Sequence, residues 1–157
     1  GTGVTIPLLE DVMSTFPNVM FNIDLKQDGI ARRVADEVRR LGISDRVLIG
    51  SFHGRRIRAF RRAAPEVATS AGRIEVARAL VSQRPGGGAD AFQVPERVGP
   101  IPIVTSRFID AARIAGKQIH VWTVNDPVDM RRLLDLGVDG IITDRPDLLN
   151  EVVFGGE

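Results

Sequence analysis

Residues 19–26 are Val-Met-Phe-Asn-Ile-Asp-Leu-Lys. The first three residues are all apolar, which is typical of a parallel strand that helices cover. Apolar and polar residues then alternate, so Asn22, Asp24 and Lys26 share one face of the strand. Because the apolar face must pack against helices, the stretch predicts a parallel α/β fold in which three polar side chains point away from the helix layer.

The rest of the chain repeats the order of strand and helix. Apolar residues at helical spacing predict helices, and short apolar runs between turn residues predict strands. The expected helices span residues 8–16, 30–41, 55–64, 74–81, 105–115, 127–136 and 146–153. The expected strands span residues 19–26, 47–51, 67–70, 91–94, 118–124 and 138–143.

Strands that are separated by helices need crossover connections, and these produce a parallel sheet. About six strands are expected, whereas a closed parallel β/α barrel of the TIM type has about eight. We therefore predict one domain over residues 1–157 that forms an incomplete TIM-type parallel β/α barrel of about six units. The competing architecture is a doubly wound open sheet, whose Gly-rich turn after the first strand is absent here.

The charges of the chain nearly balance, with 21 Lys and Arg against 20 Asp and Glu. A nucleic-acid-binding domain usually carries a strong basic excess, so no nucleic-acid partner is expected. The chain has no cysteine, which excludes disulfides, thiolate metal sites and a cysteine nucleophile. No apolar run is long enough to span a bilayer, and the first residues lack the pattern of a secretory signal. We expect a protein without membrane insertion that is located in the cytoplasm.

The polar face of the strand at residues 19–26 is the first candidate site, because reactive groups of a β/α barrel lie at the C-terminal ends of its strands. Carboxylate oxygens suit calcium or magnesium, and an ammonium group suits a phosphoryl oxygen. We therefore expect Asp24 to be a metal ligand and Lys26 to bind the substrate. The structural alternative is a buried ion pair between these two residues that has no role in catalysis.

An aromatic residue and two histidines also lie near strand ends. Trp122, the only Trp of the chain, is expected to form a wall of the substrate pocket, with a core position as the alternative. His53 is expected to bond a substrate oxygen, with a cap of the following helix as the alternative. His120 shares a strand face with Trp122 and Val124 and lies one layer deeper than Trp122. It is expected to be a satisfied core histidine, with a catalytic role as the alternative.

Two other polar features are expected to be structural. Asp144 precedes an Arg-Pro pair, and its carboxylate is expected to cap the final helix, with a role as a ligand as the alternative. The arginines between Arg55 and Arg62 lie on a helix whose core face is formed by Ile57 and Phe60. We therefore expect these arginines to be solvated and not to bind an anionic partner.

Several of these motifs together resemble the glycerophosphodiester phosphodiesterase family, in the same order and spacing along the chain. The motifs are Phe21-Asn-Ile-Asp-Leu-Lys26, Ser51-Phe52, Gln93-Val-Pro95, Val121-Trp-Thr-Val-Asn125 and Gly137-Val-Asp-Gly-Ile-Ile-Thr-Asp-Arg-Pro146. Each motif is weakly specific, but the ordered set is strongly specific.

The resemblance implies a metal-dependent barrel hydrolase of lipid and glycerol metabolism. Such an enzyme cleaves a small glycerophosphodiester into an alcohol and glycerol 3-phosphate. A carboxylate that holds calcium or magnesium in the family, commonly Glu, aligns with Asp24. The family's lysine aligns with Lys26, and its aromatic pocket residue aligns with Trp122.

The chain also departs from the family pattern. The segment Ile6-Pro-Leu-Leu-Glu-Asp-Val12 resembles the one before the family's third strand, so the first two β/α units are expected to be missing. The family's His-Arg-Gly motif and second histidine have no counterpart, and we assign no catalytic residue. We expect this segment alone to be inactive, with a non-catalytic binding or assembly module as the alternative. Open sheet edges would then favour self-association.

Overall fold

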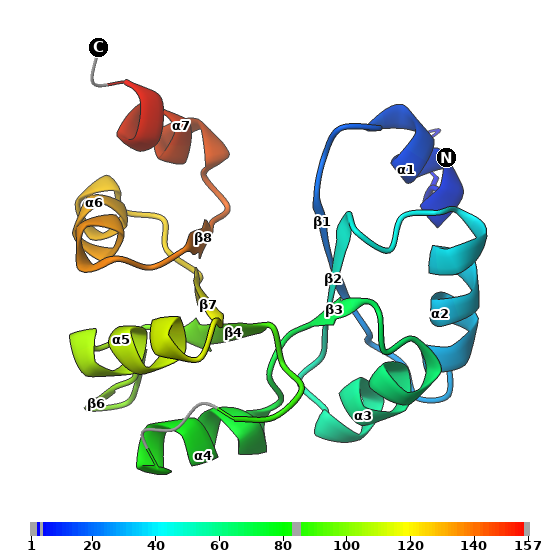
Figure 1. The fold of residues 1–157 in the computed structure, drawn as a ribbon. Coiled ribbons are helices and arrows are strands. Elements are labelled where there is room, and N and C mark those ends of the chain that lie inside the picture. The colour runs from blue at the N-terminus through cyan, green and yellow to red at the C-terminus, as the bar shows by residue number, and fades with distance from the viewer. Residues whose placement is uncertain (1–2, 4, 83–85, 156–157) are drawn as a thin grey trace.

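The computed structural model describes residue 3 and residues 5–82 and 86–155, whose main strands form two parallel sheets (Figure 1). The first sheet contains, in this order, β1 (Phe21–Asp24), β2 (Val47–Gly50) and β3 (Ala68–Thr69). The second contains, in this order, β4 (Ala91–Pro95), β7 (Gln118–Trp122) and β8 (Gly140–Ile142). All the pairs are parallel and follow the chain, which confirms the prediction of an α/β fold with parallel sheets.

The helices overlap those that the sequence predicts. They are α1 (Leu9–Thr15), α2 (Ala31–Arg40), α3 (Gly54–Ala63), α4 (Arg73–Ser82), α5 (Ser106–Ile114), α6 (Pro127–Leu136) and α7 (Pro146–Phe154). The ends of α6 show how the sequence sets these boundaries. The Asp126 carboxylate accepts hydrogen bonds from the N–H groups of Val128 and Asp129. At the other end Gly137 adopts φ +97°, a conformation that suits glycine after a helix.

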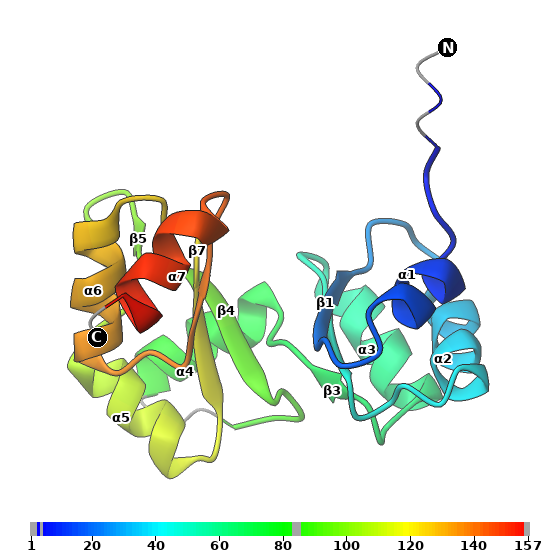
Figure 2. The same ribbon diagram turned by 90° about the horizontal axis from the view of Figure 1, so that it is seen from above.

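The two sheets meet at a parallel bridge between Ser70 and Ala91. The N–H of Ala71 donates to the carbonyl of Ala91 at 2.7 Å, and the N–H of Asp90 donates to the carbonyl of Thr69 at 2.8 Å. The Asp90 carboxylate also accepts from the N–H of Thr69 at 2.8 Å. The strands therefore follow one curve from β1 to β8 with the helices outside it (Figure 1). Figure 2 shows the first sheet with α1 to α3 beside the second sheet with α4 to α7.

A short antiparallel hairpin was not predicted. It pairs β5 (Arg97–Val98) with β6 (Ile101–Pro102), and Gly99 turns the chain with φ +57°. Residues 95–102 contain three prolines, which lack the N–H that a central strand needs, so this stretch was expected to be irregular. A hairpin whose two strands have only two residues each, outside the main sheets, tolerates proline, because few of its N–H groups need a hydrogen-bond partner.

Two hydrophobic clusters fill the space between strands and helices. The alternation predicted for β1 is confirmed, because Leu25 is buried beside Ile49 while Asn22 and Asp24 are exposed on the opposite face. The first cluster lies between β1–β3 and α1–α3 and the second surrounds β4 and β7. The polar face of the strands is therefore left for the concave side of the curve.

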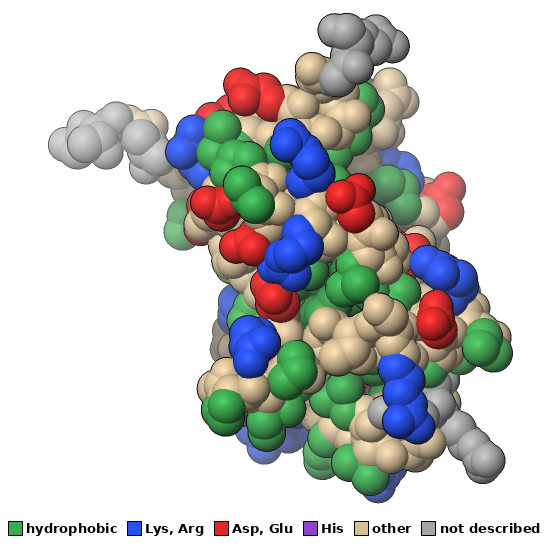
Figure 3. Space-filling view, turned by 90° about the vertical axis from the view of Figure 1, so that its left-hand side faces the viewer, with side chains coloured by type: hydrophobic (Ala, Val, Ile, Leu, Met, Phe, Trp, Pro, Cys, Tyr) green, Lys and Arg blue, Asp and Glu red, His purple; other side chains and the backbone are tan. Residues whose placement is uncertain are grey.

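The surface carries no single-sign patch on the side that Figure 3 shows, which is the side of α4 to α7. Lys and Arg side chains alternate there with Asp and Glu and with hydrophobic groups (Figure 3). This mixture agrees with the net charge of +1. No helix in the described part of the chain combines the length and the apolar character that crossing a membrane requires.

The prediction that the arginines of α3 are solvated is wrong for Arg56 and Arg61. Arg61 has a side chain that is only 18% exposed, and it donates to Thr69 Oγ1 at 2.7 Å, to Glu75 at 2.6 Å and to the carbonyl of Ser70 at 3.1 Å. Burial raises the pKa of the Glu75 carboxyl, but hydrogen bonds from Arg61 and from a backbone N–H outweigh it, so that pKa lies below its ordinary value. Arg61 therefore joins α3, β3 and α4 at the junction of the two sheets.

We expect Arg61→Met to lower the free energy of unfolding by about 2–3 kcal/mol, because it leaves the half-buried Glu75 without its partner. The matched control is Arg62→Met, an exposed arginine on the same helix, which should change stability by less than about 0.5 kcal/mol. Urea unfolding followed by circular dichroism measures both variants. Equal losses in the two variants would contradict a structural role for Arg61.

Candidate active site

One cavity of about 810 Å³ is lined by residues from both sheets. Asn22 and Asp24 of β1 contribute from the first sheet, and Gln93 of β4 and Trp122 of β7 contribute from the second. The polar face of β1 and the aromatic end of β7 therefore meet across one space, as expected for the C-terminal ends of barrel strands.

Asp24 and Lys26 form an ion pair, with Lys26 Nζ at 2.6 Å from Asp24 Oδ2. The side chain of Lys26 is 74% exposed and that of Asp24 is 33% exposed. The ion pair of the structural alternative is therefore present, but it is exposed and not buried, and exposed ion pairs contribute only about 0–1 kcal/mol to stability. Asp24 lines the cavity, whereas Lys26 is not among the lining residues and reaches it through its contacts with Asp24 and Phe52.

Aromatic rings form one wall beside this pair. Phe52 and Trp122 pack edge to face with ring centroids 5.7 Å apart. Lys26 Nζ lies 5.3 Å from the centre of the Phe52 ring, and the guanidinium of Arg73 lies 5.8 Å from it. An aromatic wall with two cations above it can hold the carbon skeleton of a ligand and present positive charge to its anionic group. The position of Trp122 on the cavity agrees with the wall that the sequence suggests.

Phe52, Arg73 and Gln93 were not predicted as site residues. Phe52 directly follows β2 in the Ser51-Phe52 motif, and Gln93 belongs to the Gln-Val-Pro motif of β4, so both had a signal in the sequence. Arg73 begins α4 and had no such signal, because its approach to Phe52 depends on how α4 returns to the first sheet.

His53 does not line the cavity with Trp122 and Asp24. It occupies the N-cap position of α3, and its side chain makes no capping hydrogen bond. Its backbone N–H donates to Ser51 Oγ at 3.3 Å. The side chain of His53 is exposed, so the structure brings it neither to the aromatic wall nor to the cap that was the alternative.

His120 has polar partners on both ring nitrogens. Its Nδ1 lies 3.4 Å from Gln93 Nε2, and its Nε2 lies 3.2 Å from Gln118 Oε1. Burial lowers the pKa of His120 below its ordinary value of 6.5, and the nearby Asp139 carboxylate opposes this shift only partly. The prediction of satisfied ring nitrogens is confirmed, but His120 is half-buried and belongs to neither core cluster. The prediction that Val124 shares its strand face is wrong, because β7 ends at Trp122 and Val124 is buried in the core of the second sheet.

Asp144 does not cap the final helix as predicted. The N-cap residue of α7 is Arg145, and it makes no side-chain capping bond. The Asp144 carboxylate instead accepts from Asn125 Nδ2 at 3.2 Å, and Asn125 Oδ1 accepts from the N–H of Asp144 and from Thr143 Oγ1, both at 2.9 Å. Asn125 therefore ties the loop after β7 to the loop after β8.

The described residues do not by themselves form a cation site. Nowhere in the described ranges do three His, Cys, Asp or Glu side chains converge. Asp24 is the carboxylate that lines the cavity, whereas calcium and magnesium take about six or more oxygen ligands. Asp24 could thus supply one ligand, and the rest of such a site is not present among these residues.

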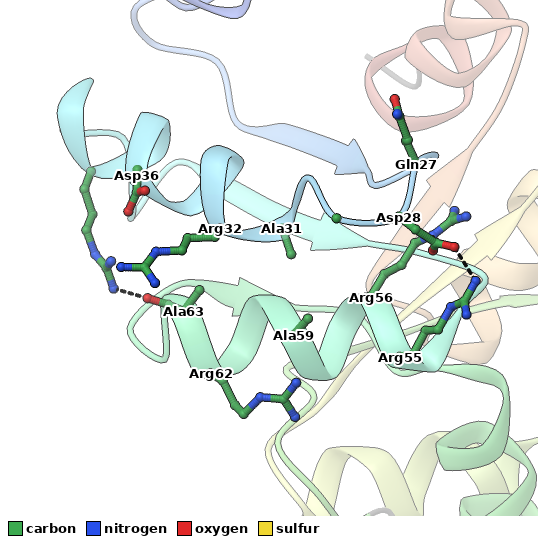
Figure 4. A pocket seen from close by; sticks show the side chains of 12 residues that line it. Gln27, Asp28, Ala31, Arg32, Asp36, Arg55, Arg56, Ala59, Arg62 and Ala63 are labelled. Atoms are coloured by element: carbon green, nitrogen blue, oxygen red, sulfur yellow. Dashed lines mark hydrogen bonds and ion pairs between the residues drawn. The ribbon is translucent and has the colours of Figure 1, made fainter.

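A second hollow of about 670 Å³ lies between α2 and α3 and shares no residue with the first (Figure 4). Its floor contains the small residues Ala31, Ala59 and Ala63, and arginines surround it. Arg55 and Arg56 are paired with Asp28, as the dashed line in Figure 4 shows for one of them. Because its charges are largely paired within the protein, this hollow is a weaker candidate than the cavity that contains Asp24.

Comparison with known proteins gives matches over nearly the whole chain. The model of the "Glycerophosphoryl diester phosphodiesterase family" matches residues 3–148. The chain is 39% identical to "Probable glycerophosphodiester phosphodiesterase 2" of Mycobacterium tuberculosis, over 98% of this chain and 62% of that protein. The chain therefore spans less than two thirds of the length of this relative.

Solved structures share its fold. A glycerophosphodiester phosphodiesterase from Agrobacterium tumefaciens str. C58 superposes with a TM-score of 0.70 at 24% identity, over 94% of this chain and 61% of that one. An Oleispira antarctica phosphodiesterase in complex with the product sn-glycerol-3-phosphate superposes with a TM-score of 0.65 at 14% identity, over 91% and 58%.

The lowered pKa of His120 predicts a pH-dependent contribution to stability. The folded state binds fewer protons than the unfolded state below pH 6.5, so this contribution is fully present above pH 6.5 and is lost as the pH falls through the folded-state pKa. In His120→Gln the group cannot titrate. We therefore expect the stability of the wild type relative to this variant to decrease between pH 7.5 and pH 5, measured by urea unfolding at several pH values. A difference that is constant over this range would contradict the assignment.

Proposed function

Because the chain belongs to the glycerophosphoryl diester phosphodiesterase family, we propose that it forms the substrate-binding part of a hydrolase that acts on glycerophosphodiesters. The observation that carries the proposal is the cavity at which Asp24 and Lys26 meet Phe52 and Trp122 from the other strands. In the reaction, the oxygen of water bonds to phosphorus, the P–O bond to the alcohol breaks, and a proton of water passes to the leaving alcohol. The products are glycerol 3-phosphate and an alcohol.

The cavity offers groups for each part of such a substrate. Lys26 and Arg73 would attract the anionic phosphodiester, Lys as a point charge and Arg through its planar array of donors. The rings of Phe52 and Trp122 would pack against the carbon atoms beside it. These residues bind and orient the substrate. We assign them no proton transfer, and neither histidine of the chain lines the cavity.

We further propose that the fold is an incomplete TIM-type barrel of six β/α units, in which two more would join β8 to β1. Support comes from strands in chain order and from the partial coverage of the relatives. Asp24 would supply one ligand for a calcium or magnesium ion, and carboxylates of the two further units would complete the site. When bound, such an ion neutralises phosphoryl charge and activates the attacking water.

An alternative function is a non-catalytic module that acts by binding or assembly. It is favoured by the polar N–H and C=O groups of β1 and β8, which have no strand partner on their outer sides within the described residues. Such edges pair readily with another chain, so self-association through them is part of this alternative. Static light scattering across a dilution series detects such assemblies.

The proposed function is tested by the release of glycerol 3-phosphate from glycerophosphocholine. We expect this segment alone to be at least about a hundredfold slower than a longer protein that includes two preceding β/α units, because general acid–base groups contribute about 10²–10⁴-fold. Calcium or magnesium should stimulate only the longer protein. A longer protein that binds metal but releases no product would favour the non-catalytic alternative.

Asp24→Asn and Lys26→Met are expected to reduce the activity of the longer protein by about 10²-fold or more while leaving its melting temperature nearly unchanged. The reason is that the pair is exposed and adds little to stability, while Asp24 lines the cavity and Lys26 lies over the ring of Phe52, which also lines it. Asp36→Asn is the matched control, since Asp36 is an exposed carboxylate on the second hollow. A large loss of melting temperature with normal activity per folded molecule would instead assign the pair a structural role.

A further inference from the structure

We propose that the substrate of this site carries one long hydrocarbon chain, which lies along an apolar wall that continues from the polar floor of the cavity. The inference rests on the proposed function and narrows its substrate class to single-chain glycerophosphodiesters. The chain is attached either to the glycerol or to the alcohol, since both place hydrocarbon next to the same phosphodiester. The P–O bond that breaks is unchanged.

The wall consists of one side of α4 and of the β5–β6 hairpin. Its residues from α4 are Val76, Ala77, Leu80 and Val81, and its residues from the hairpin and the segment after it are Val98, Ile101 and Ile103. The same cavity includes Asn22 and Asp24 at its other end. The cavity is therefore polar at the strand ends and hydrocarbon-like toward α4, which is the distribution that an amphiphilic ligand needs.

Helix α4 is apolar on two sides, which core packing alone does not require. Ala79 is buried in the second core, and Val76 and Leu80 pack partly against that core. Val76 and Leu80 also line the cavity, together with Ala77 and Val81, which are not part of that core, and Val81 is 88% exposed. A surface helix normally shows one apolar stripe and a polar opposite face. The second apolar side of α4 therefore faces space that the described residues do not fill.

The β5–β6 hairpin also presents exposed apolar side chains to the cavity. Val98 and Ile101 pair across it, and both are more than half exposed although both line the cavity. Contiguous exposed apolar groups are uncommon on soluble proteins and mark ligand grooves or interaction sites. A deacylated glycerophosphodiester is polar throughout, so an apolar wall adds nothing to its affinity. Each methylene group of a hydrocarbon chain that the wall buries fully would instead raise the affinity of the ligand about fourfold.

The strands of further β/α units would lie away from this wall. Such units would join the end strands β1 and β8, whereas α4 follows β3 and the hairpin follows β4, in the middle of the strand order. A volume of about 810 Å³ also has room for a ligand larger than glycerol 3-phosphate. The ligand that matches both the polar and the apolar part of the cavity is one molecule that carries a phosphodiester and a hydrocarbon chain.

Binding is measured through Trp122, because it is the only Trp and lies in the cavity. Two probes are titrated below their micelle concentrations: 1-dodecanoyl-glycerol 3-phosphocholine, with the chain on glycerol, and glycerol 3-phosphododecanol, with the chain on the alcohol. Glycerophosphocholine is the chainless reference. We expect at least one chain-bearing probe to change the fluorescence saturably, with an affinity at least tenfold above the reference, and the stronger of the two identifies the attachment point.

The double variant Val81→Asn with Ile101→Asn should lower the affinity for the tighter-binding probe about tenfold and leave the affinity for glycerophosphocholine unchanged. Both side chains are exposed, so folding is not at risk. Ile114→Asn on α5 is the matched control, since Ile114 is also 88% exposed but does not line the cavity. Equal affinity for all three ligands, or equal weakening by the control, overturns the proposal. So does a fluorescence response to phosphatidylcholine vesicles alone, which would identify the wall as a membrane-docking surface.

Turnover by the longer protein separates this inference from the proposed function. Hydrolysis of glycerophosphocholine without preference for either chain-bearing substrate would overturn the apolar wall and leave the proposed function standing. Chain-dependent binding that Val81→Asn with Ile101→Asn abolishes, in a longer protein that hydrolyses none of these compounds, would support the wall and overturn the proposed function.

Discussion

The position of every site residue depends on the junction at which β3 meets β4. The parallel bridge between Ser70 and Ala91 joins two sheets that otherwise have separate cores. Asp90 strengthens the junction twice, because its N–H and its carboxylate both bond to the backbone of Thr69. Without this register the polar end of β1 and the aromatic end of β7 would belong to two unrelated surfaces.

Two ion pairs of equal length have opposite roles because their surroundings differ. The pair of Arg61 with Glu75 and that of Lys26 with Asp24 both have N–O distances of 2.6 Å. Arg61 is largely withdrawn from water and satisfies several groups at the sheet junction, so removing it leaves buried polar atoms without partners. Lys26 is mostly exposed, and water screens its attraction to Asp24. The first pair thus belongs to the scaffold and the second is available to a ligand.

In the proposed function this chain binds and orients the substrate and does not transfer protons. His120 has polar partners on both ring nitrogens and His53 lies outside the cavity. What remains at the cavity is positive charge near aromatic rings, with one carboxylate beside it. This division of labour is consistent with a chain that spans 62% of a longer relative. The apolar side of α4 extends the same binding surface, so the polar and hydrocarbon parts of the cavity form one continuous site.

The sequence by itself determined the α/β class, the helices and the strands of the two parallel sheets, and the shared face of Asn22 and Asp24, because a period of two along a strand is a local property of the chain. It also indicated the wall at Trp122 through its place at a strand end. It did not determine that Arg73 approaches Phe52, that Arg61 of α3 is half-buried, or that Asp144 bonds to Asn125 and caps no helix. Those contacts join different helices, strands and loops, and only the packing of these elements in the tertiary structure decided which side chains meet.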